Sequence, residues 1–308
     1  MKKLQTRAIS LLLSLVMVAS LLPTTVWAAD TASPITQEEW SSNYYTPAEL
    51  SGYSFEYAFT MTGGDVAYAY FLKRVPNPEG TGMMNERVLV VARDKTGTDY
   101  TIPDYDSAGD APWGGDADAN KLFIEAGITE IGAYAFSNMP SLTSVTLGDS
   151  SALTYVGKRA FSGNDRAVFT DTKSGAQNVL DLSNVTSMGE YAFASCAKLT
   201  SVTLGGDITA VETGEGGAGN VETQHKLPKA AFSGCSSLNT VIFADESRLE
   251  IIGQSALSGT ALTGVTVPSG VREIEQSAFS GLSKMNSLVL PDSLETIGER
   301  AFYCNTDV

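Results

Sequence analysis

A phrase of apolar residues at fixed spacing recurs from Ile128 to the end of the chain, and it restricts the possible folds more than any other feature. The Ala-Phe pair that marks the phrase has its alanine at positions 135, 160, 192, 231, 256, 278 and 301, with Leu257 once replacing phenylalanine. A repeat of roughly 20–29 residues with apolar residues at fixed phases is typical of a solenoid, in which successive coils stack on one another.

The part of the repeat that follows each Ala-Phe pair predicts a short strand. In the pattern Leu-x-x-Val-x-Leu the last two apolar residues alternate with polar ones, so they point to one face of a strand. The instances are Leu142/Val145/Leu147, Leu199/Val202/Leu204, Leu238/Val241/Phe243, Leu262/Val265/Val267 and Met285/Leu288/Leu290. Stacked coils would align these strands in a parallel sheet, with the Ala-Phe segment returning along the other side. We therefore expect an α/β leucine-rich-repeat solenoid of short parallel strands and short return turns or helices.

Two further patterns concern the bends and the insertions of the coils. Glycine follows the apolar residue that precedes Ala-Phe at positions 132, 157, 189, 253 and 298, which suggests a tight bend. Pro228 and Glu275 take that place in two other coils, so positive φ is not required in every coil. Surplus residues within 162–178 and 205–226 are expected to emerge as loops at the solenoid edge.

The sequence divides into four expected parts. Residues 1–28 combine a basic start, an apolar run and a small-x-small site that ends at Ala28, which predicts a cleaved secretory signal peptide. Residues 29–52 predict an extended lead, and residues 53–120 a β-rich N-terminal cap with strands at 53–61, 66–72, 87–92 and 98–102 and a loop at 74–85. Residues 121–308 predict the solenoid, with about seven coils and the last one incomplete.

Charge and export restrict the partners. The formal net charge is −15 at pH 7, which disfavours nucleic acid and anionic membrane surfaces. Outside the expected signal peptide there is no long apolar run, so we expect no membrane insertion after signal cleavage. The predicted location is therefore outside the cell or on its surface.

The chain resembles the BspA-type leucine-rich repeat proteins of bacterial surfaces. The resemblance covers about residues 102–308 and rests on the lead-in Ile102-Pro103-Asp104-Tyr105, on the run from Lys121 to Gly132, and on repeats of the form I-G-x-x-A-F…L-x-x-V-x-L. It implies a secreted or surface-displayed, non-catalytic solenoid used for adhesion and for binding protein or matrix.

Candidate chemical groups are few, and no catalytic residue, metal site or cofactor is predicted. His225 is the single histidine and is expected in an exposed loop. The acidic residues Asp104, Asp106, Asp110, Asp116 and Asp118 only partly follow a calcium-loop pattern, because Lys121 stands where glycine is required. Cys196 and Cys235 occupy the same phase of adjacent coils, where they are either buried small hydrophobes or a bridge between coils.

The outward face of the predicted sheet is the remaining candidate site, which we expected to be the concave side. Its small, mostly hydroxyl-bearing residues alternate with the core positions, and such a surface can bind a ligand through many weak contacts. The candidate binding residues are Ser144, Thr146, Asp181, Ser201, Thr203, Thr240, Thr266 and Ser287. The expected partner is an extracellular protein or a glycan.

Two alternatives remain open at this point. The solenoid could be a structural spacer that presents a C-terminal domain missing from this sequence, and that domain could be an enzyme. The last coil stops at residue 308, before its own strand, so a truncated chain or an end covered by a partner is expected.

Overall fold

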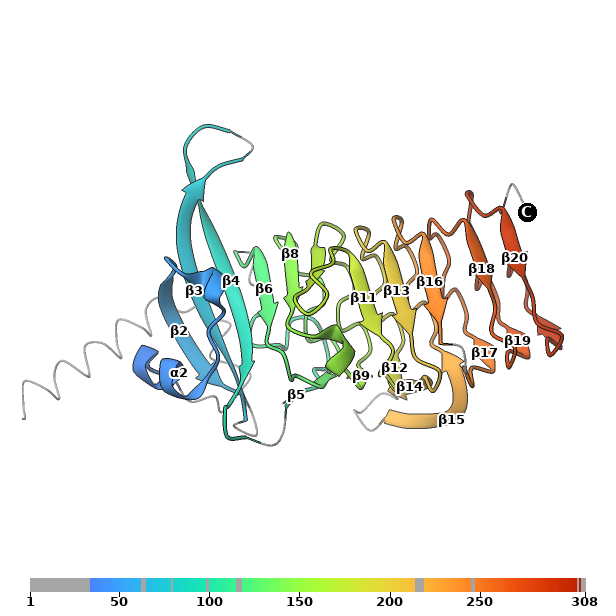
Figure 1. The fold of residues 1–308 in the computed structure, drawn as a ribbon, viewed down its shortest axis with the longest axis horizontal. Helices are drawn as coiled ribbons and strands as arrows, with labels where there is room; N and C mark the ends of the chain where they lie inside the picture. Colours follow the sequence, from blue (N-terminus) through green and yellow to red (C-terminus); the bar gives the residue numbers. More distant parts are fainter. Residues whose placement is uncertain are drawn as a thin grey trace, which may run out of the picture.

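The structure is a computed structural model that describes residues 34–61, 65–78, 80–97, 100–114, 118–213, 219–244, 247–303 and 305, without the side chains of 212–224. The expected signal peptide lies outside the described residues. An N-terminal cap stands at one end of a long stack of coils, and the described chain ends at the other (Figure 1).

Each coil contributes a longer strand to one side of the solenoid, and the coil with the first insertion contributes two. The longer strands lie side by side along the long axis of the molecule, with neighbours in parallel register where they pair (Figure 1). Their core positions are those that the repeat predicted. Val145 and Val202 are fully buried, while the strand residues before and after each valine face outward. These strands are β6 (Lys121–Ile124), β8 (Ser144–Leu147), β10 (Val168–Asp171), β11 (Val179–Leu182), β13 (Ser201–Leu204), β16 (Thr240–Phe243), β18 (Gly264–Thr266) and β20 (Ser287–Val289).

Shorter strands form a second sheet along another side. The nine-stranded sheet runs in the order β21-β19-β17-β15-β14-β12-β9-β7-β5. Its members are β5 (Thr101–Ile102), β7 (Glu130–Ile131), β9 (Tyr155–Val156), β12 (Ser187–Gly189), β14 (Thr209–Thr213), β15 (Gly219–Leu227), β17 (Ile251–Ile252), β19 (Glu273–Ile274) and β21 (Thr296–Ile297). The expected α/β leucine-rich-repeat solenoid is therefore present, with turns rather than helices returning the chain between strands.

The Ala-Phe turns form the third side, and backbone hydrogen bonds link each turn to the next. Phe193 N donates to Ala231 O at 2.9 Å, and Phe232 N donates to Ala256 O at 2.9 Å. The phenylalanine rings point inward and stack from coil to coil, with Phe161 and Phe193 centroids 5.3 Å apart. Buried apolar area and stacked aromatic pairs both stabilise this side.

The residue before each repeat alanine adopts a left-handed conformation, although none of the seven is glycine. Their φ values lie between 51° and 58°, and the residues are Tyr134, Arg159, Tyr191, Ala230, Ser255, Ser277 and Arg300. This conformation costs roughly 1–2 kcal/mol for an L-residue. In this conformation the backbone N–H of the residue points to the next coil. Tyr191 N, for example, donates to Lys229 O at 2.9 Å.

The repeat glycines act through close approach rather than through positive φ. None of the glycines at 132, 157, 189, 253 and 298 has positive φ. A Cβ on Gly189 would lie 2.2 Å from Lys158 N, and one on Gly132 would lie 2.0 Å from Pro103 O. Each glycine therefore lets its coil pack directly on the backbone of the preceding coil, and the tight-bend interpretation is corrected accordingly.

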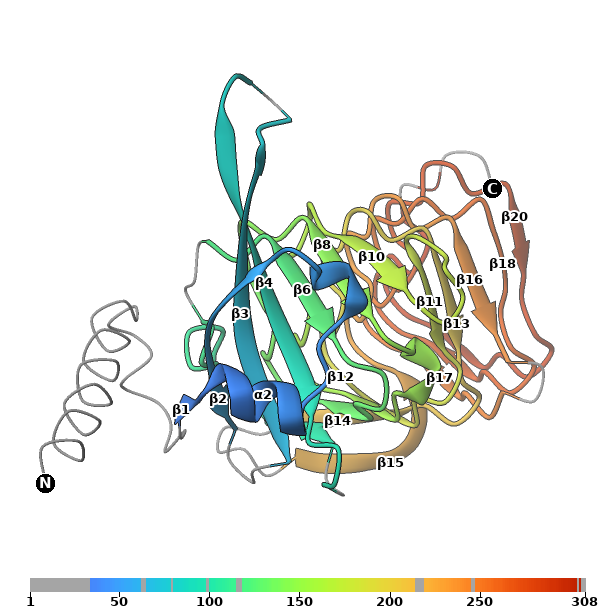
Figure 2. The ribbon, with the colours of Figure 1, turned by 60° about the vertical axis from the view of Figure 1, so that its left-hand side comes forward.

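The cap continues the longer-strand sheet with an antiparallel meander. Strands β2 (Ser54–Thr60), β3 (Val66–Pro76) and β4 (Met83–Arg93) pair in order, β1 (Pro34–Ile35) pairs with β2, and β4 pairs in parallel with β6. The expected loop at 74–85 is largely strand, because β3 and β4 run on as an arm that projects beyond the solenoid (Figures 1 and 2). Pro76 is tolerated because it ends its strand.

The lead is not simply extended, because residues 37–43 form helix α2 (Gln37–Asn43). Thr36 and Glu39 make a capping box at its start. Trp40 is buried, stacks on Tyr44 with centroids 5.0 Å apart, and meets Phe71 edge-on at 6.3 Å. The helix therefore covers one face of the cap sheet, as Figure 2 shows, and a 3₁₀ turn (Ala48–Leu50) follows it.

The two insertions contain strands where loops were expected. The first contains β10, which pairs with β8, and the second contains β14 and β15, which pair antiparallel and join the shorter-strand sheet. His225 is half-buried in β15 opposite Thr209, so its expected place in an exposed loop is wrong.

Candidate functional site

The predicted binding residues lie at outward positions of the longer strands. Their exposure rises along the solenoid, since those on β8, β11 and β13 are half-buried while those on β16, β18 and β20 are exposed. The half-buried residues are Ser144, Thr146, Asp181, Ser201 and Thr203, and the exposed residues are Thr240, Thr266 and Ser287. The outward face of β8, β10, β11, β13, β16, β18 and β20 is called the strand face below.

Strand register brings several of these residues into rows. Ser201 lies opposite Thr240, and Asp181 lies opposite Thr203. Val168 and Thr170 on β10 lie opposite Ser144 and Thr146, and sequence reasoning missed them because β10 belongs to an insertion. The rows are not continuous, because the longer strands form three separate paired sets with breaks between β10 and β11 and between β16 and β18.

The cap bounds the strand face at its N-terminal end. Phe123, at an outward position of β6, is only 8% exposed because it belongs to the core beneath α2. Tyr45 stacks on its ring, with centroids 6.3 Å apart. The open part of the face therefore begins at β8.

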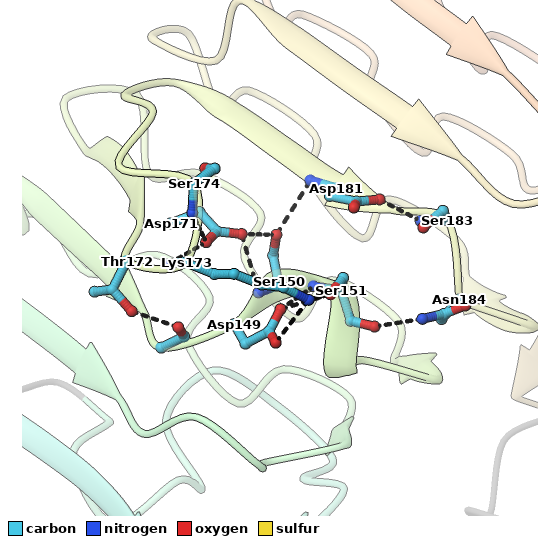
Figure 3. A network of polar contacts seen from close by, with 11 residues as sticks. Asp149, Ser150, Ser151, Asp171, Thr172, Lys173, Ser174, Asp181, Ser183 and Asn184 are labelled. Atoms are coloured by element: carbon cyan, nitrogen blue, oxygen red, sulfur yellow. Dashed lines mark hydrogen bonds and ion pairs between the residues drawn. The ribbon is translucent and has the colours of Figure 1, made fainter.

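A polar network fills the break between β10 and β11, as Figure 3 shows. The buried Asp171 carboxylate accepts hydrogen bonds from Ser150 N at 3.1 Å, Lys173 N at 2.8 Å and Ser174 N at 3.1 Å, and also from the Ser150 hydroxyl. Ser150 Oγ in turn accepts from Asp181 N at 3.1 Å. Four donors satisfy the buried carboxylate, so this network holds the strand face together and leaves Asp171 no spare bond for a ligand.

Asp181 takes part in the same network through its backbone, and its side chain caps a turn. Asp181 Oδ1 accepts from Ser183 N at 3.0 Å. Asn184 Nδ2 donates to Ser151 O at 2.7 Å and so ties the end of β11 to the 3₁₀ turn Ser150–Ala152. The carboxylate of Asp181 remains half-exposed on the strand face.

A hollow of about 920 Å³ opens beside the second break. Its walls come from β16, β18, β20 and the turns that follow them, and they include Ile242, Val289 and Leu290, which are 51%, 52% and 39% exposed. Ile242 and Val289 alternate with the core positions of β16 and β20, but they were not among the predicted binding residues. They supply the apolar contact area that the hydroxyl rows lack.

The acidic segment before the solenoid is used to join coils. Asp104 Oδ1 accepts from Ala133 N at 2.6 Å and from the Tyr155 hydroxyl at 3.4 Å. Among the described residues, no three His, Cys, Asp or Glu side chains are grouped to hold a metal ion, and Asp116 lies outside that part of the chain.

Cys196 and Cys235 are free, buried thiols. Cys196 Sγ donates to Phe161 O at 3.3 Å, and Cys235 Sγ donates to Phe193 O at 3.1 Å. Burial raises the pKa of Cys235 to about 12 and that of Cys196 well above its usual value. Of the two alternatives, the structure therefore shows small buried residues that stay protonated and unreactive at neutral pH.

Stacked coils with short parallel strands, an inward phenylalanine and a return turn in each repeat are typical of the leucine-rich-repeat class of solenoids. The family model of the BspA type leucine rich repeat region matches residues 115–214 and 221–308 in six copies. The chain belongs to the BspA-type leucine-rich repeat family. No curated protein matches the sequence at a significant level.

Solved structures with a similar arrangement come from several bacteria. A leucine rich cell surface protein from Faecalibacterium prausnitzii A2-165 is 22% identical with a TM-score of 0.46, and the match covers 80% of this chain and 54% of that one. A Treponema protein, the T. pallidum leucine rich repeat protein TpLRR, is 17% identical with a TM-score of 0.43, covering 82% and 85%. The pneumococcal vaccine antigen PcpA is 17% identical with a TM-score of 0.39, covering 75% and 48%. The chain thus spans about half of the Faecalibacterium protein.

Among the described residues, no helix has both the length and the apolar character needed to cross a bilayer.

Proposed function

We propose that this chain is a secreted or cell-surface, non-catalytic binding protein that takes part in adhesion by recognising extracellular protein or glycan through the strand face. The observation that carries the proposal is the arrangement of Ser201, Thr203 and Thr240 at outward positions of adjacent, registered strands, next to the hollow whose wall includes the exposed Ile242. A rigid array of this kind offers many weak polar contacts beside an apolar anchor point.

Family membership and the sequence start support the location. BspA-type repeats match most of the solenoid, and the Faecalibacterium relative is described as a cell surface protein. The basic start and apolar run of residues 1–28 support export.

A binding screen of the purified protein tests the proposal. We expect saturable binding to at least one extracellular-matrix protein or arrayed glycan, measured with and without calcium. Changing Thr203 and Thr240 to tryptophan should weaken that binding, because bulky side chains would block the rows. A folded, monodisperse sample that binds nothing would contradict the proposal and favour the structural-spacer alternative.

A further inference from the structure

Each coil places two residues on the turn side, the side of the solenoid that the Ala-Phe turns form, directly before its repeat alanine. Backbone hydrogen bonds hold these residues beside those of the next coil, since Arg159 N donates to Glu190 O and Tyr191 N donates to Lys229 O, both at 2.9 Å. The two positions therefore form two rows along the solenoid. Their members are Ala133-Tyr134, Lys158-Arg159, Glu190-Tyr191, Lys229-Ala230, Gln254-Ser255, Gln276-Ser277 and Glu299-Arg300.

Positive charge gathers in three consecutive coils of these rows. Lys158, Arg159 and Lys229 are the cations, and Glu190 is the single acidic residue at the same positions. The whole chain, in contrast, has 35 acidic and 20 basic residues. Lys158 Nζ lies 3.9 Å from Glu190 Oε2, whereas no carboxylate among the described residues forms an ion pair with Arg159 or Lys229. The local balance of charge is therefore opposite to that of the chain.

The ring of Tyr191 brings two of these cations together. Arg159, from the preceding coil, has its Cζ 4.3 Å from the ring centroid, and Lys229, from the following coil, has its Nζ 6.0 Å from it. Cation–π contacts of this kind hold both side chains in place. A stacked guanidinium keeps its N–H donors along its edge, where a carboxylate can accept two of them. The side chain of Arg159 is therefore already oriented for an anion.

The last described coil shows that the repeat does not require this arrangement. Arg300 occupies the same phase as Arg159, with φ of 57° against 53°, and lies over Tyr303 with its Cζ 5.8 Å from the ring centroid. Its Nε lies 3.5 Å from Glu299 Oε1, so the charge of Arg300 is balanced within its own coil. The coils around Tyr191 instead bring like charges together, and a bound anion would offset their repulsion.

The groups around Tyr191 favour a sugar chain over a protein as the source of that anion. Protein interfaces are built around apolar and aromatic anchors, but the large exposed hydrophobic residues of the described chain lie outside these turns. The rows continue instead with Gln254, Ser255 and Gln276, whose amide and hydroxyl groups can hydrogen-bond sugar hydroxyls.

The spacing of the cations favours a ligand with charges along its length. Arg159 and Lys229 belong to coils that are two strand spacings apart, which is roughly 10 Å. The formal net charge of −15 repels a polyanion at long range. At physiological ionic strength this repulsion is screened beyond about 8 Å, so the nearest charges decide binding at the surface.

We propose that Arg159, Lys229 and Lys158 form a binding site on the turn side for an acidic polysaccharide that carries carboxylate groups. Arg159 donates two hydrogen bonds to one carboxylate, and Lys229 binds a second carboxylate farther along the chain. The site lies on a different side of the solenoid from the strand face. It therefore goes beyond the proposed function and does not depend on it.

Labelled decagalacturonate is the probe, and fluorescence anisotropy with the full purified protein is the measurement. The matched control ligand is the fully methyl-esterified oligomer, which has the same sugar chain without the charges. We expect saturable binding of the acid form, weakening as salt is added, and binding at least about tenfold weaker for the ester. Equal binding of the two forms, or no binding by a folded protein, would overturn the proposal.

Three variants locate the site. Arg159→Gln and Lys229→Gln should each weaken binding of decagalacturonate by about tenfold, because each removes a charged donor. Arg300→Gln, at the same phase of the last described coil, is the control and should leave the Kd unchanged. Circular dichroism confirms that all three variants are folded. Equal weakening by Arg159→Gln and Arg300→Gln would refute the site, because it would show a general effect of charge.

Two further comparisons distinguish the ligand class and the surface. A decaglutamate peptide that binds more tightly than decagalacturonate would overturn the assignment to a polysaccharide and indicate an acidic protein. Thr203→Trp should leave binding of decagalacturonate unchanged, and a loss in this variant would place the oligomer on the strand face instead. Failure of the turn-side site leaves recognition through the strand face intact, because the two are tested with different variants.

Discussion

Phe193 and Phe232 stack face to face, with ring centroids 5.4 Å apart and planes 2° from parallel, although they come from different coils. They belong to a continuous stack that starts at Trp113 in the cap and passes through Phe136 and Phe161. Tyr68 meets Trp113 edge-on at 5.4 Å, so cap and solenoid share one core. Leu257 interrupts the stack, which resumes where Phe279 stacks on Phe302 with centroids 5.5 Å apart.

The stack gives a graded stability prediction. Phe193→Ala should lower the free energy of unfolding by about 3–5 kcal/mol, because a fully buried ring leaves a cavity. Phe193→Leu should cost less than about 1.5 kcal/mol, since Leu257 shows that leucine is accommodated at this phase. Urea denaturation followed by circular dichroism provides the comparison, and equal losses for the two variants would argue against a specific packing role.

The left-handed residue before each repeat alanine predicts opposite effects at adjacent positions. Ala230 has φ of 51°, so Ala230→Gly relieves strain and should be neutral or stabilise by up to about 1 kcal/mol. Ala231→Gly, at a buried position without positive φ, should destabilise by about 1 kcal/mol. Thermal melting of both variants tests the assignment, which fails if Ala230→Gly is the more damaging change.

Close packing of coils through the repeat glycines predicts a severe effect of one methyl group. A Cβ on Gly189 would lie 2.2 Å from the backbone nitrogen of Lys158, so Gly189→Ala should cost about 3 kcal/mol. Gly175 has φ of 67° but nothing within 4 Å of an added Cβ, so Gly175→Ala should cost only the backbone strain, about 1 kcal/mol. Unfolding midpoints that rank the two variants the other way would contradict the packing role.

Glu125 at the junction of cap and solenoid predicts a pH dependence. Burial raises the pKa of Glu125 above its usual value, an effect that Arg93 partly offsets through an ion pair at 3.4 Å. Between the unfolded and the folded pKa the native chain therefore binds more protons than the unfolded chain, and stability falls as pH rises through that window. Relative to Glu125→Gln, which does not titrate, the natural protein should lose stability from about pH 4 upward. If the difference in unfolding free energy between the two proteins does not change with pH, the prediction is contradicted. If the natural protein instead becomes relatively more stable as pH rises, Glu125 is stabilised as the anion.

The repeat predicted the interior of the solenoid because the same pattern gives the alternation of each strand and the position of the inward phenylalanine in each coil. Leu142, Val145 and Leu147 are buried as their alternation required, and every phenylalanine of the Ala-Phe pairs from 136 to 279 points into the core. These positions could be read directly because burial leaves a regular hydrophobic signal.

Backbone features left no comparable signal. Tyr134, Arg159 and Ala230 share a left-handed conformation, yet no common residue type marks them, because hydrogen bonds to the next coil impose the geometry. Strand β10 follows the alternation of a strand, but its place in an insertion suggested a loop. Helix α2 was missed because its apolar anchor is the single residue Trp40, too few for a helical period.

The candidate site was predicted in part. Alternation placed the eight candidate residues at outward strand positions, whereas the two breaks in the array are features of tertiary pairing that no local pattern records. The binding role of these residues remains a prediction.

The most direct test of the account compares one bulky substitution on each sheet. Thr203→Trp lies on the strand face, and Ser187→Trp lies at a half-buried position of β12 on the shorter-strand sheet. Affinity for the ligand found in the binding screen is measured for both variants by surface plasmon resonance. The account predicts at least about a tenfold weaker Kd for Thr203→Trp and an unchanged Kd for Ser187→Trp. Equal affinities, or a loss confined to Ser187→Trp, would contradict recognition through the strand face.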